Sequence, residues 1–412
     1  MNNLNGNFDV AIIGAGPSGA VAAAQLARNG HKVLVLEKQH FPRFSIGESL
    51  LPQSMELLEQ AGMLQAVVEA GFQFKNGAAF ANKGLYDFFD FREKFSPGWG
   101  TTYQVQRAQF DKILADCATK DGAEIRYGHA VESYTEIDDN SVQLHVYDEQ
   151  QNEYDITAKF VLDASGFGRV LPKLLNLEKE STLSTRISLF THIEDRIGLK
   201  YFDRNKILIS VHPENNEIWY WLIPFSDGRA SVGVVLPRTI YEQHQHQEDA
   251  DILKYFIYQT GKMSESLTEA VFDTPVGKLA GYSSDVTQMS GKHFALLGNA
   301  GEFLDPVFSS GVTIALKSAI LAAETLDKQL RGEQVNWKND FEQPLKLGID
   351  TFRQFVEGWY DGSLQTVIFT KDKNPAVKAM ICSVLAGYAW DTSNPYVKNP
   401  KRLHVLAQLC QK

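Results

Sequence analysis

A lysine with aromatic neighbours is the first candidate for chemistry in this chain. Lys75 lies in the segment FKNGAAF, close in sequence to Phe72, Phe74 and Phe80. Contact with aromatic rings would remove water from the amine and lower its pKa, which favours the neutral, nucleophilic form. A lysine exposed on the surface of a strand is the alternative, so the environment of Lys75 stays open at this point.

Two tryptophans mark a second unusual segment, WYWLIPF, at residues 219–225. Side chains alternate between the two faces of a strand, so Trp219 and Trp221 share one face and Tyr220 takes the other. The paired tryptophans therefore either form a wall that excludes water from a passage or pack in the core between a sheet and helices.

The N-terminal sequence has the pattern of a dinucleotide-binding unit. Its parts are an apolar strand, the turn GAGPSG, a small-residue helix and a second strand, expected at residues 8–13, 14–19, 20–28 and 32–36. In such a unit Gly14 makes the tight turn, Gly16 lets a pyrophosphate approach the backbone, and Gly19 lets helix and strand pack closely. The phosphates would lie at the helix N-terminus, where free N–H groups favour anions. Glu37 follows the second strand and would accept hydrogen bonds from ribose hydroxyls, which favours FAD or NAD over NADP.

A second helix start, near residue 310, could also face an anion. A short strand is expected at 294–297 and a long helix at 312–329, with SSG directly before the helix. The backbone N–H groups of Ser310 and Gly311 would face something negative or electron-rich. Two such helix ends in one chain indicate a long cofactor, held at both its diphosphate and its ring system, and FAD has that shape.

Composition limits the class of protein. With 412 residues the chain exceeds the size of a single core, and 44% hydrophobic and 22% charged residues are typical of a globular protein. The formal charge of -10 argues against nucleic acid and against an anionic membrane surface. Three scattered cysteines suit the reducing cytoplasm, and neither a targeting segment nor a membrane span is expected. His244 and His246 lie in a polar run, so no metal site is predicted.

Two segments resemble flavoproteins of the aromatic-hydroxylase type. QVQRAQFDKIL, with Arg107, is similar to their flavin-contacting helix start, and VLDASGFGR, with Asp163 and Gly166, is similar to their internal flavin motif. The second segment reads DASG where that group has DG followed by a small residue and serine. This departure disfavours a self-sufficient hydroxylase, and no second nicotinamide fingerprint is visible.

The resemblance to flavin-dependent halogenases is closer. FPRFSIGESLLP is similar to their second flavin loop, WYWLIP matches their WxWxIP signature, and residues 303–311 match their FxxPxxSxG pattern. Lys75 stands where that family carries its essential lysine. Geranylgeranyl reductase relatives carry a similar aromatic strand.

The resemblance implies FAD as the cofactor. The residues expected to bind it are Gly14, Gly16, Pro17, Ser18, Gly19, Glu37, Lys38, Arg43, Gly47, Glu48, Ser49, Arg107, Val131, Asp163, Gly166, Gly298, Asn299, Asp305, Pro306, Gly311 and Val312.

The same resemblance implies a reaction in which reduced FAD, oxygen and a halide ion give hypohalous acid for use on an aromatic substrate. Lys75 would hold the acid by a hydrogen bond or as an N-halo amine. The N–H groups of Ser310 and Gly311 would bind the halide, unless that helix end serves only the flavin ring. Trp219 and Trp221 would form the wall of the passage between the flavin and Lys75.

A separate flavin reductase is the expected source of reduced FAD. The C-terminal region is short for a halogenase that acts on free tryptophan. The resemblance therefore implies an open site and a phenolic or pyrrolic substrate, either a small molecule or a group bound to a carrier protein. Three alternatives stay open: a flavin monooxygenase, a geranylgeranyl-type reductase, and a flavin-binding accessory subunit without chemistry of its own.

The expected fold class is α/β. It combines a Rossmann-like FAD-binding domain of the glutathione-reductase or aromatic-hydroxylase type, an antiparallel substrate sheet and a helical C-terminal region. RISLFTHI, KILISVH, EIWYWLIP and RASVGVVL would form the sheet together with the Lys75 strand. The expected ranges are 1–71, 100–180 and 286–335 for the FAD-binding domain, 72–99 and 181–285 for the substrate domain, and 336–412 for the helical region.

Overall fold

The first sheet carries the dinucleotide-binding unit, as seen in a computed structural model that describes residues 4–198, 202–371 and 374–410. Its strand order is β7-β2-β1-β10-β9-β8, and β18 also pairs with β10. The neighbours of β1, β2 and β18 are parallel, whereas β8, β9 and β10 form an antiparallel meander. The bounds are β1 (Gly6–Ile13), β2 (Val33–Glu37), β7 (Glu124–Tyr127), β8 (His129–Glu136), β9 (Val142–Asp148), β10 (Glu153–Asp163) and β18 (Phe294–Leu296).

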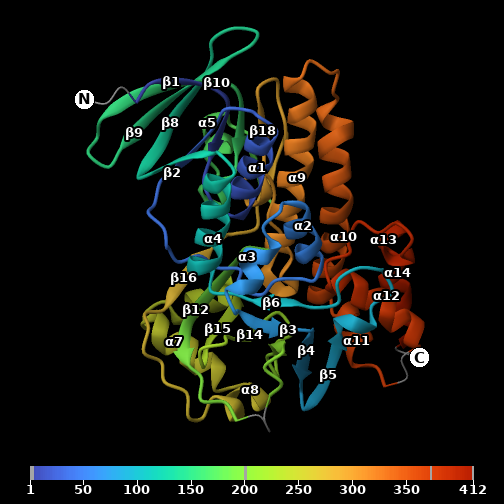
Figure 1. Cartoon of the computed structure of the whole chain (residues 1–412). Helices are drawn as coiled ribbons and strands as arrows, with labels where there is room; N and C mark the ends of the chain where they lie inside the picture. The colour runs from blue at the N-terminus through green and yellow to red at the C-terminus, as the bar shows by residue number, and fades with distance from the viewer. Residues whose placement is uncertain (1–3, 199–201, 372–373, 411–412) are drawn as a thin grey trace.

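Three helices pack closely beside this sheet. α1 (Pro17–Arg28) is largely buried through small side chains and contacts both α4 (Arg107–Lys120) and α9 (Ser310–Leu330). Figure 1 shows the long α9 running between α1 and α10 (Gln343–Tyr360). α1 begins three residues before the expected start at residue 20, because proline fits the first turn of a helix.

The second sheet has the order β16-β12-β15-β14-β13-β4-β5. Its pairs are antiparallel except for β4 and β13, which run parallel. The expected antiparallel sheet is therefore mixed at this one junction. The bounds are β4 (Gly77–Asn82), β5 (Leu85–Asp90), β12 (Arg186–Glu194), β13 (Lys206–Val211), β14 (Trp219–Pro224), β15 (Arg229–Pro237) and β16 (Gly277–Ala280).

The two faces of β14 belong to different cores. Trp219 and Trp221 join the large core shared with the FAD-binding region, whereas Tyr220 packs in a second cluster. That second cluster contains residues of α7 (Asp249–Ile257) and α8 (Gly261–Ser266). A third helix, α6 (Arg238–His244), precedes these two in the sequence. The alternation predicted from strand periodicity is thus confirmed.

The strand that carries Lys75 does not belong to the second sheet. β3 (Gln73–Lys75) pairs with β6 (Thr102–Gln104) in a separate two-stranded ribbon. Pairing changes at Asn76, whose backbone N–H and C=O bond to Asn205 and Phe91. The expectation that Lys75 lies in the substrate sheet is therefore wrong, and the sheet strand begins only at Gly77.

The C-terminal region is helical. α10 follows a π-helical turn and contacts α9, and α11 and α14 pack on each other (Figure 1, orange to red). No helix in the described ranges is long and apolar enough to cross a membrane. The remaining bounds are α2 (Gln53–Gln60), α3 (Leu64–Glu69), α5 (Val170–Leu174), β11 (Glu178–Lys179), β17 (Asp285–Val286), α11 (Ser363–Phe369), α12 (Pro375–Leu385), α13 (Pro395–Lys398) and α14 (Arg402–Cys410).

Candidate active site

A cavity of about 690 Å³ runs from the glycine-rich turn of the first sheet to the tryptophan face of the second. The predicted site residues that line it are Gly14, Gly16, Pro17, Ser18, Glu37, Lys38, Arg43, Gly47, Glu48, Ser49, Arg107, Val131, Gly166, Trp219, Trp221, Asn299, Pro306, Gly311 and Val312. Those outside the lining are Gly19, Lys75, Asp163, Gly298, Asp305 and Ser310.

The glycine-rich turn has the geometry that a diphosphate needs. Gly14 has φ +96°, and a Cβ there would lie 2.6 Å from the Ala164 carbonyl oxygen. A Cβ on Gly16 would meet only the Arg43 guanidinium, at 3.5 Å, so the backbone is open on the cavity side. A Cβ on Gly19 would lie 1.9 Å from the Gly14 carbonyl oxygen, so this glycine serves the packing of helix on strand.

Glu37 ends β2 at the cavity. Its two carboxylate oxygens each accept one backbone N–H at 2.9 Å, from Ala15 and Gln39. Because each oxygen can accept further hydrogen bonds, Glu37 can still receive ribose hydroxyls. The turn, the open backbone at Gly16 and this terminal acid together fit the adenosine diphosphate half of FAD.

A buried ion cluster holds the loop from Arg43 to Ser49. Arg107 bonds to Asp111 at 2.7 and 3.0 Å and donates to the Ile46 carbonyl oxygen at 2.5 Å. Arg43 also reaches Asp111, at 3.1 Å. The arginines therefore bind a shared carboxylate and shape the loop against the cavity.

Three of the four predicted cofactor residues outside the lining shape local backbone. The Asp163 carboxyl accepts from the N–H groups of Ser165 and Leu171 at 2.9 and 2.6 Å. Gly298 has φ +51° and packs against α9. Asp305 caps the turn at Pro306–Phe308, since its carboxyl accepts from the Val307 N–H at 3.0 Å. These three residues therefore shape the backbone beside the cavity, and their part in cofactor binding stays a prediction.

Lys75 is completely buried. Its Nζ donates to Ser49 Oγ and to the Leu50 carbonyl oxygen, both at 2.7 Å, and lies 5.4 Å from the centre of the Phe91 ring. Within the described part of the chain no carboxylate lies within ion-pair distance. Burial lowers the pKa of Lys75 from 10.5 to about 7. A large fraction of this amine is therefore neutral at neutral pH.

Two expectations about this lysine are corrected by its surroundings. The surface alternative is wrong, because the side chain has no exposure. Phe74 is 41% exposed and does not share the buried environment of the amine, and the ring found beside the amine is that of Phe91, from beyond the next hairpin. Ser49 lines the cavity and Lys75 does not, so the hydrogen bond to Ser49 links the buried amine to a residue of the cavity wall.

The two tryptophans form part of the cavity wall. Their ring centres lie 5.9 Å apart, and both side chains are almost fully buried. The Trp221 indole N–H donates to Ser231 Oγ at 3.0 Å. Opposite it on β15, a Cβ on Gly233 would lie 2.3 Å from the Trp221 ring, so only glycine leaves room for this ring position.

A tyrosine that sequence reasoning missed ties this wall to α10. The Trp219 indole N–H donates to Tyr360 Oη at 2.9 Å, and Tyr360 donates to Asp305 Oδ2 at 2.8 Å. The Arg186 guanidinium lies 3.5 Å above the Tyr360 ring. Burial raises the pKa of Asp305 from 3.8 to about 6. No local pattern marks Tyr360, because its role depends on a partner 141 residues away in sequence.

The start of α9 faces the same cavity. Gly311 lines it and Ser310 lies just behind, while Ser309 caps the helix with φ +57°. A left-handed backbone costs a non-glycine residue about 1 kcal/mol or more and is commonly retained at functional sites. The first N–H groups of the helix have no partner within the helix and can receive an anion.

Comparison with known proteins relates this chain to FAD-binding proteins and to halogenases. The profile of the FAD binding domain family matches residues 7–340. The 1H-pyrrole-2-carbonyl-[peptidyl-carrier protein] chlorinase of Pseudomonas fluorescens is 28% identical, over 98% of this chain and 92% of its own length. The flavin-dependent halogenase ascD of Acremonium egyptiacum is 30% identical, over 86% of this chain and 68% of its own length.

Solved structures agree in shape. A flavoprotein/dehydrogenase from Cytophaga hutchinsonii superposes with a TM-score of 0.93 at 42% identity, covering 98% of this chain and 99% of its own. The flavin-dependent brominase Bmp2 superposes with a TM-score of 0.83 at 25% identity, covering 99% and 100%.

Proposed function

This chain belongs to the FAD-binding-domain family and within it to the flavin-dependent halogenases, and we propose that it places a halogen on an electron-rich aromatic ring, phenolic or pyrrolic. One observation carries the proposal: a fully buried lysine, free of any carboxylate in the described ranges, hydrogen-bonded to a serine that lines the cofactor cavity.

The cofactor is FAD, in keeping with the family and with the fit of the glycine-rich turn and Glu37. When bound and reduced, FAD supplies the oxidising power from oxygen that turns a halide ion into hypohalous acid. The residues expected to hold it are the predicted cofactor residues that line the cavity, from Gly14 to Val312, except Glu48 and Ser49, for which we propose other roles. The roles of individual residues stay predictions.

Lys75 would receive the hypohalous acid. A neutral amine accepts a hydrogen bond from the acid, or takes the halogen with loss of water to give an N-halo amine, whereas an ammonium does neither. The lowered pKa of about 7 supports the neutral form. Transfer of the halogen to the ring replaces a ring hydrogen and returns the free amine. Because Lys75 itself does not line the cavity, the acid would have to pass Ser49 to reach the amine.

The α9 start and the tryptophan wall would play supporting parts. The N–H groups of Ser310 and Gly311 would hold the halide without a full positive charge that binds it too tightly. The alternative, that this helix end serves the flavin ring alone, stays open. Trp219 and Trp221 would keep water and the organic substrate from the place where the oxidant forms.

Partners follow from the relatives. Two of them are named as a chlorinase and a brominase of pyrrole-2-carbonyl groups on a peptidyl carrier protein. A carrier-bound ring is therefore one proposed substrate form, and a free phenol is the other. A separate flavin reductase would deliver reduced FAD, because no second nicotinamide fingerprint is visible in the sequence.

The test is halide-dependent product formation. The protein, FAD, a flavin reductase with NADH, oxygen and bromide or chloride are combined with phenols and with a carrier-bound pyrrole, and products are identified by mass spectrometry. Lys75→Ala should abolish halogenation. Lys206→Ala is the matched control, since Lys206 is also buried but pairs with Asp203 at 2.6 Å, and it should retain turnover. Halogenated product from Lys75→Ala would contradict the proposal.

The 42% identical flavoprotein/dehydrogenase supports a second candidate, an FAD-dependent dehydrogenase. Such an enzyme needs no halide. Oxidation of a substrate with reduction of FAD in halide-free buffer, unaffected by Lys75→Ala, would favour this candidate over halogenation.

A further inference from the structure

An acidic side chain in the cavity has an oxygen that no protein group satisfies. Glu48 lines the cavity and is 2% exposed, and its Oε1 lies 2.6 Å from His192 Nε2. Its Oε2 is buried and has no hydrogen-bond partner among the described residues. An unpaired carboxyl oxygen in a low-dielectric site is costly, so its presence points to a ligand that donates a hydrogen.

Three cationic side chains near the Glu48 loop bond to groups other than the Glu48 carboxyl. Arg43 and Arg107 both bond to Asp111. Lys75 donates to Ser49 and to the Leu50 carbonyl oxygen. Within the described ranges, His192 is the one basic side chain within ion-pair distance of Glu48.

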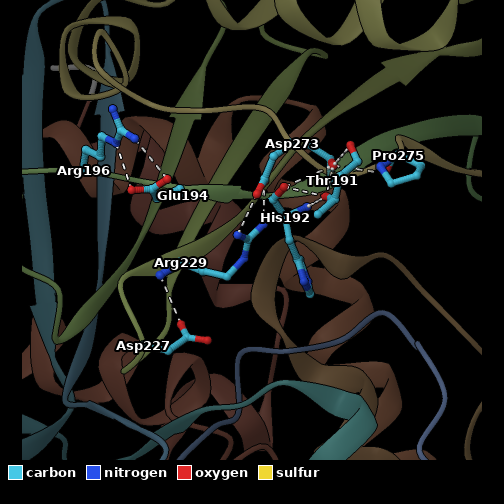
Figure 2. A network of polar contacts seen from close by, with 9 residues as sticks. Thr191, His192, Glu194, Arg196, Asp227, Arg229, Asp273 and Pro275 are labelled. Carbon is cyan, nitrogen blue, oxygen red and sulfur yellow. Dashed lines mark hydrogen bonds and ion pairs between the residues drawn. The ribbon is translucent and has the colours of Figure 1, made fainter.

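The backbone of His192 is held in place by a threonine side chain. Its backbone N–H and C=O both bond to Thr274 Oγ1, at 3.2 and 2.6 Å. Figure 2 shows its imidazole directed away from this network, in which Arg229 binds Asp273 at 2.7 and 3.0 Å. Arg229 therefore pairs with Asp273, and Glu48 is the acidic residue that contacts the imidazole of His192.

Aromatic rings frame the pair. The His192 ring lies 5.5 Å from the Phe44 ring and 5.2 Å from the Phe225 ring, both edge to face. Phe44 lines the cavity and is 54% exposed, and it stacks on Phe190 at 5.8 Å. This end of the cavity thus combines aromatic surface with the unpartnered Oε2 of Glu48.

We propose that Glu48 Oε2 accepts a hydrogen bond from the ring O–H or N–H of the aromatic substrate and that His192 is the positioning residue that orients the carboxyl group. The ligand class is an electron-rich aromatic with a donor on or in the ring, such as a phenol or pyrrole. The inference rests on the proposed function, because it names the part of the substrate that this site recognises.

The arrangement would serve both binding and reactivity. A carboxylate that accepts the hydrogen bond pulls the proton away from the phenol oxygen or pyrrole nitrogen. The electron density of the ring rises, which favours attack of the ring on an electrophilic halogen. Glu48 and Ser49 are consecutive, and their segment is tied to the strand before α4 by Val105 N–H to the Glu48 carbonyl oxygen at 2.7 Å. One short segment therefore carries the acceptor for the substrate and the hydroxyl that contacts Lys75.

The same oxygen could instead receive a donor from FAD. The experiment separates the two sources by binding measurements without turnover, on protein saturated with oxidised FAD. Phloroglucinol is the probe, and 1,3,5-trifluorobenzene is the matched probe of similar shape without O–H donors. Probe binding is followed by calorimetry or by quenching of the cavity tryptophans, and FAD affinity by flavin fluorescence.

Glu48→Leu should weaken phloroglucinol binding at least about tenfold, while trifluorobenzene and FAD affinities stay within about twofold. Glu48→Gln should give a smaller loss, and it covers the case in which Glu48→Leu does not fold. His192→Leu should weaken phloroglucinol binding, and His192→Gln, which keeps an N–H donor for Glu48, should restore most of it.

Four results would overturn the inference. They are unchanged phloroglucinol affinity in both Glu48 variants, an equal loss for trifluorobenzene, a parallel loss of FAD affinity, and no phloroglucinol binding by the wild type. None depends on halogenation, so they are distinct from failure of the proposed function, which the Lys75→Ala product assay reports.

Discussion

Replacing Lys75 by methionine should stabilise the fold at neutral pH while it abolishes halogenation. In the unfolded chain the amine titrates near 10.5, and burial lowers its pKa in the folded protein to about 7. The unfolded chain therefore binds the proton more tightly than the folded protein does. Between these two values, folding must release a proton, so the free energy of unfolding of the wild type falls as the pH falls from about 10.5 to 7.

The size of the effect follows from the two pKa values. Their separation corresponds to a cost of about 4 kcal/mol at pH 7 and about 1 kcal/mol at pH 10. Methionine removes this cost but also removes two hydrogen bonds, to Ser49 and Leu50, which contribute about 2 kcal/mol together. The variant should therefore be more stable than the wild type by about 2 kcal/mol at pH 7 and less stable by about 1 kcal/mol at pH 10.

Urea unfolding at pH 7, 8.5 and 10, followed by tryptophan fluorescence at equal FAD concentration, measures this difference. Lys206→Met is the matched control. It loses an ion pair to Asp203 and should be destabilised throughout. A difference between wild type and Lys75→Met that stays constant across these pH values would refute the reasoning, because it would mean that the buried amine does not titrate in this window.

Three further outcomes are expected. Asp305→Asn should flatten the pH dependence of the free energy of unfolding between about pH 4 and pH 6, and thermal unfolding over this range checks it. The reason is that a carboxyl whose folded pKa is raised to about 6 contributes stability that is full below about pH 4 and is lost as the pH rises through 6. Gly233→Ala should displace the Trp221 ring and cost about 1 to 3 kcal/mol, seen in urea unfolding and in altered indole fluorescence. Ser49→Ala should lower the halogenation rate about tenfold with FAD affinity unchanged, because Lys75 loses a hydrogen-bond partner at the cavity, and Ser49→Thr should retain more activity.

The dinucleotide-binding unit could be predicted from sequence because its rules are local. Gly14, Gly16 and Gly19 are needed by backbone geometry within a few residues of themselves, and Glu37 follows from the length of one helix and one strand. The two faces of β14 were likewise readable, since alternation along a strand does not depend on what packs against it. FAD as the cofactor and the α/β class rest on such local patterns together with the halogenase motifs.

Only the tertiary structure decided the environment of Lys75. Its burial depends on Phe91 and on the loop before α2, and its strand pairs with β6 because the chain changes partners at Asn76. Tyr360, whose bond to Trp219 joins segments far apart in sequence, gave no local signal for the same reason. A motif records which side chains a short segment offers, whereas solvent exclusion and long-range hydrogen bonds are set by whichever distant segments fold against it.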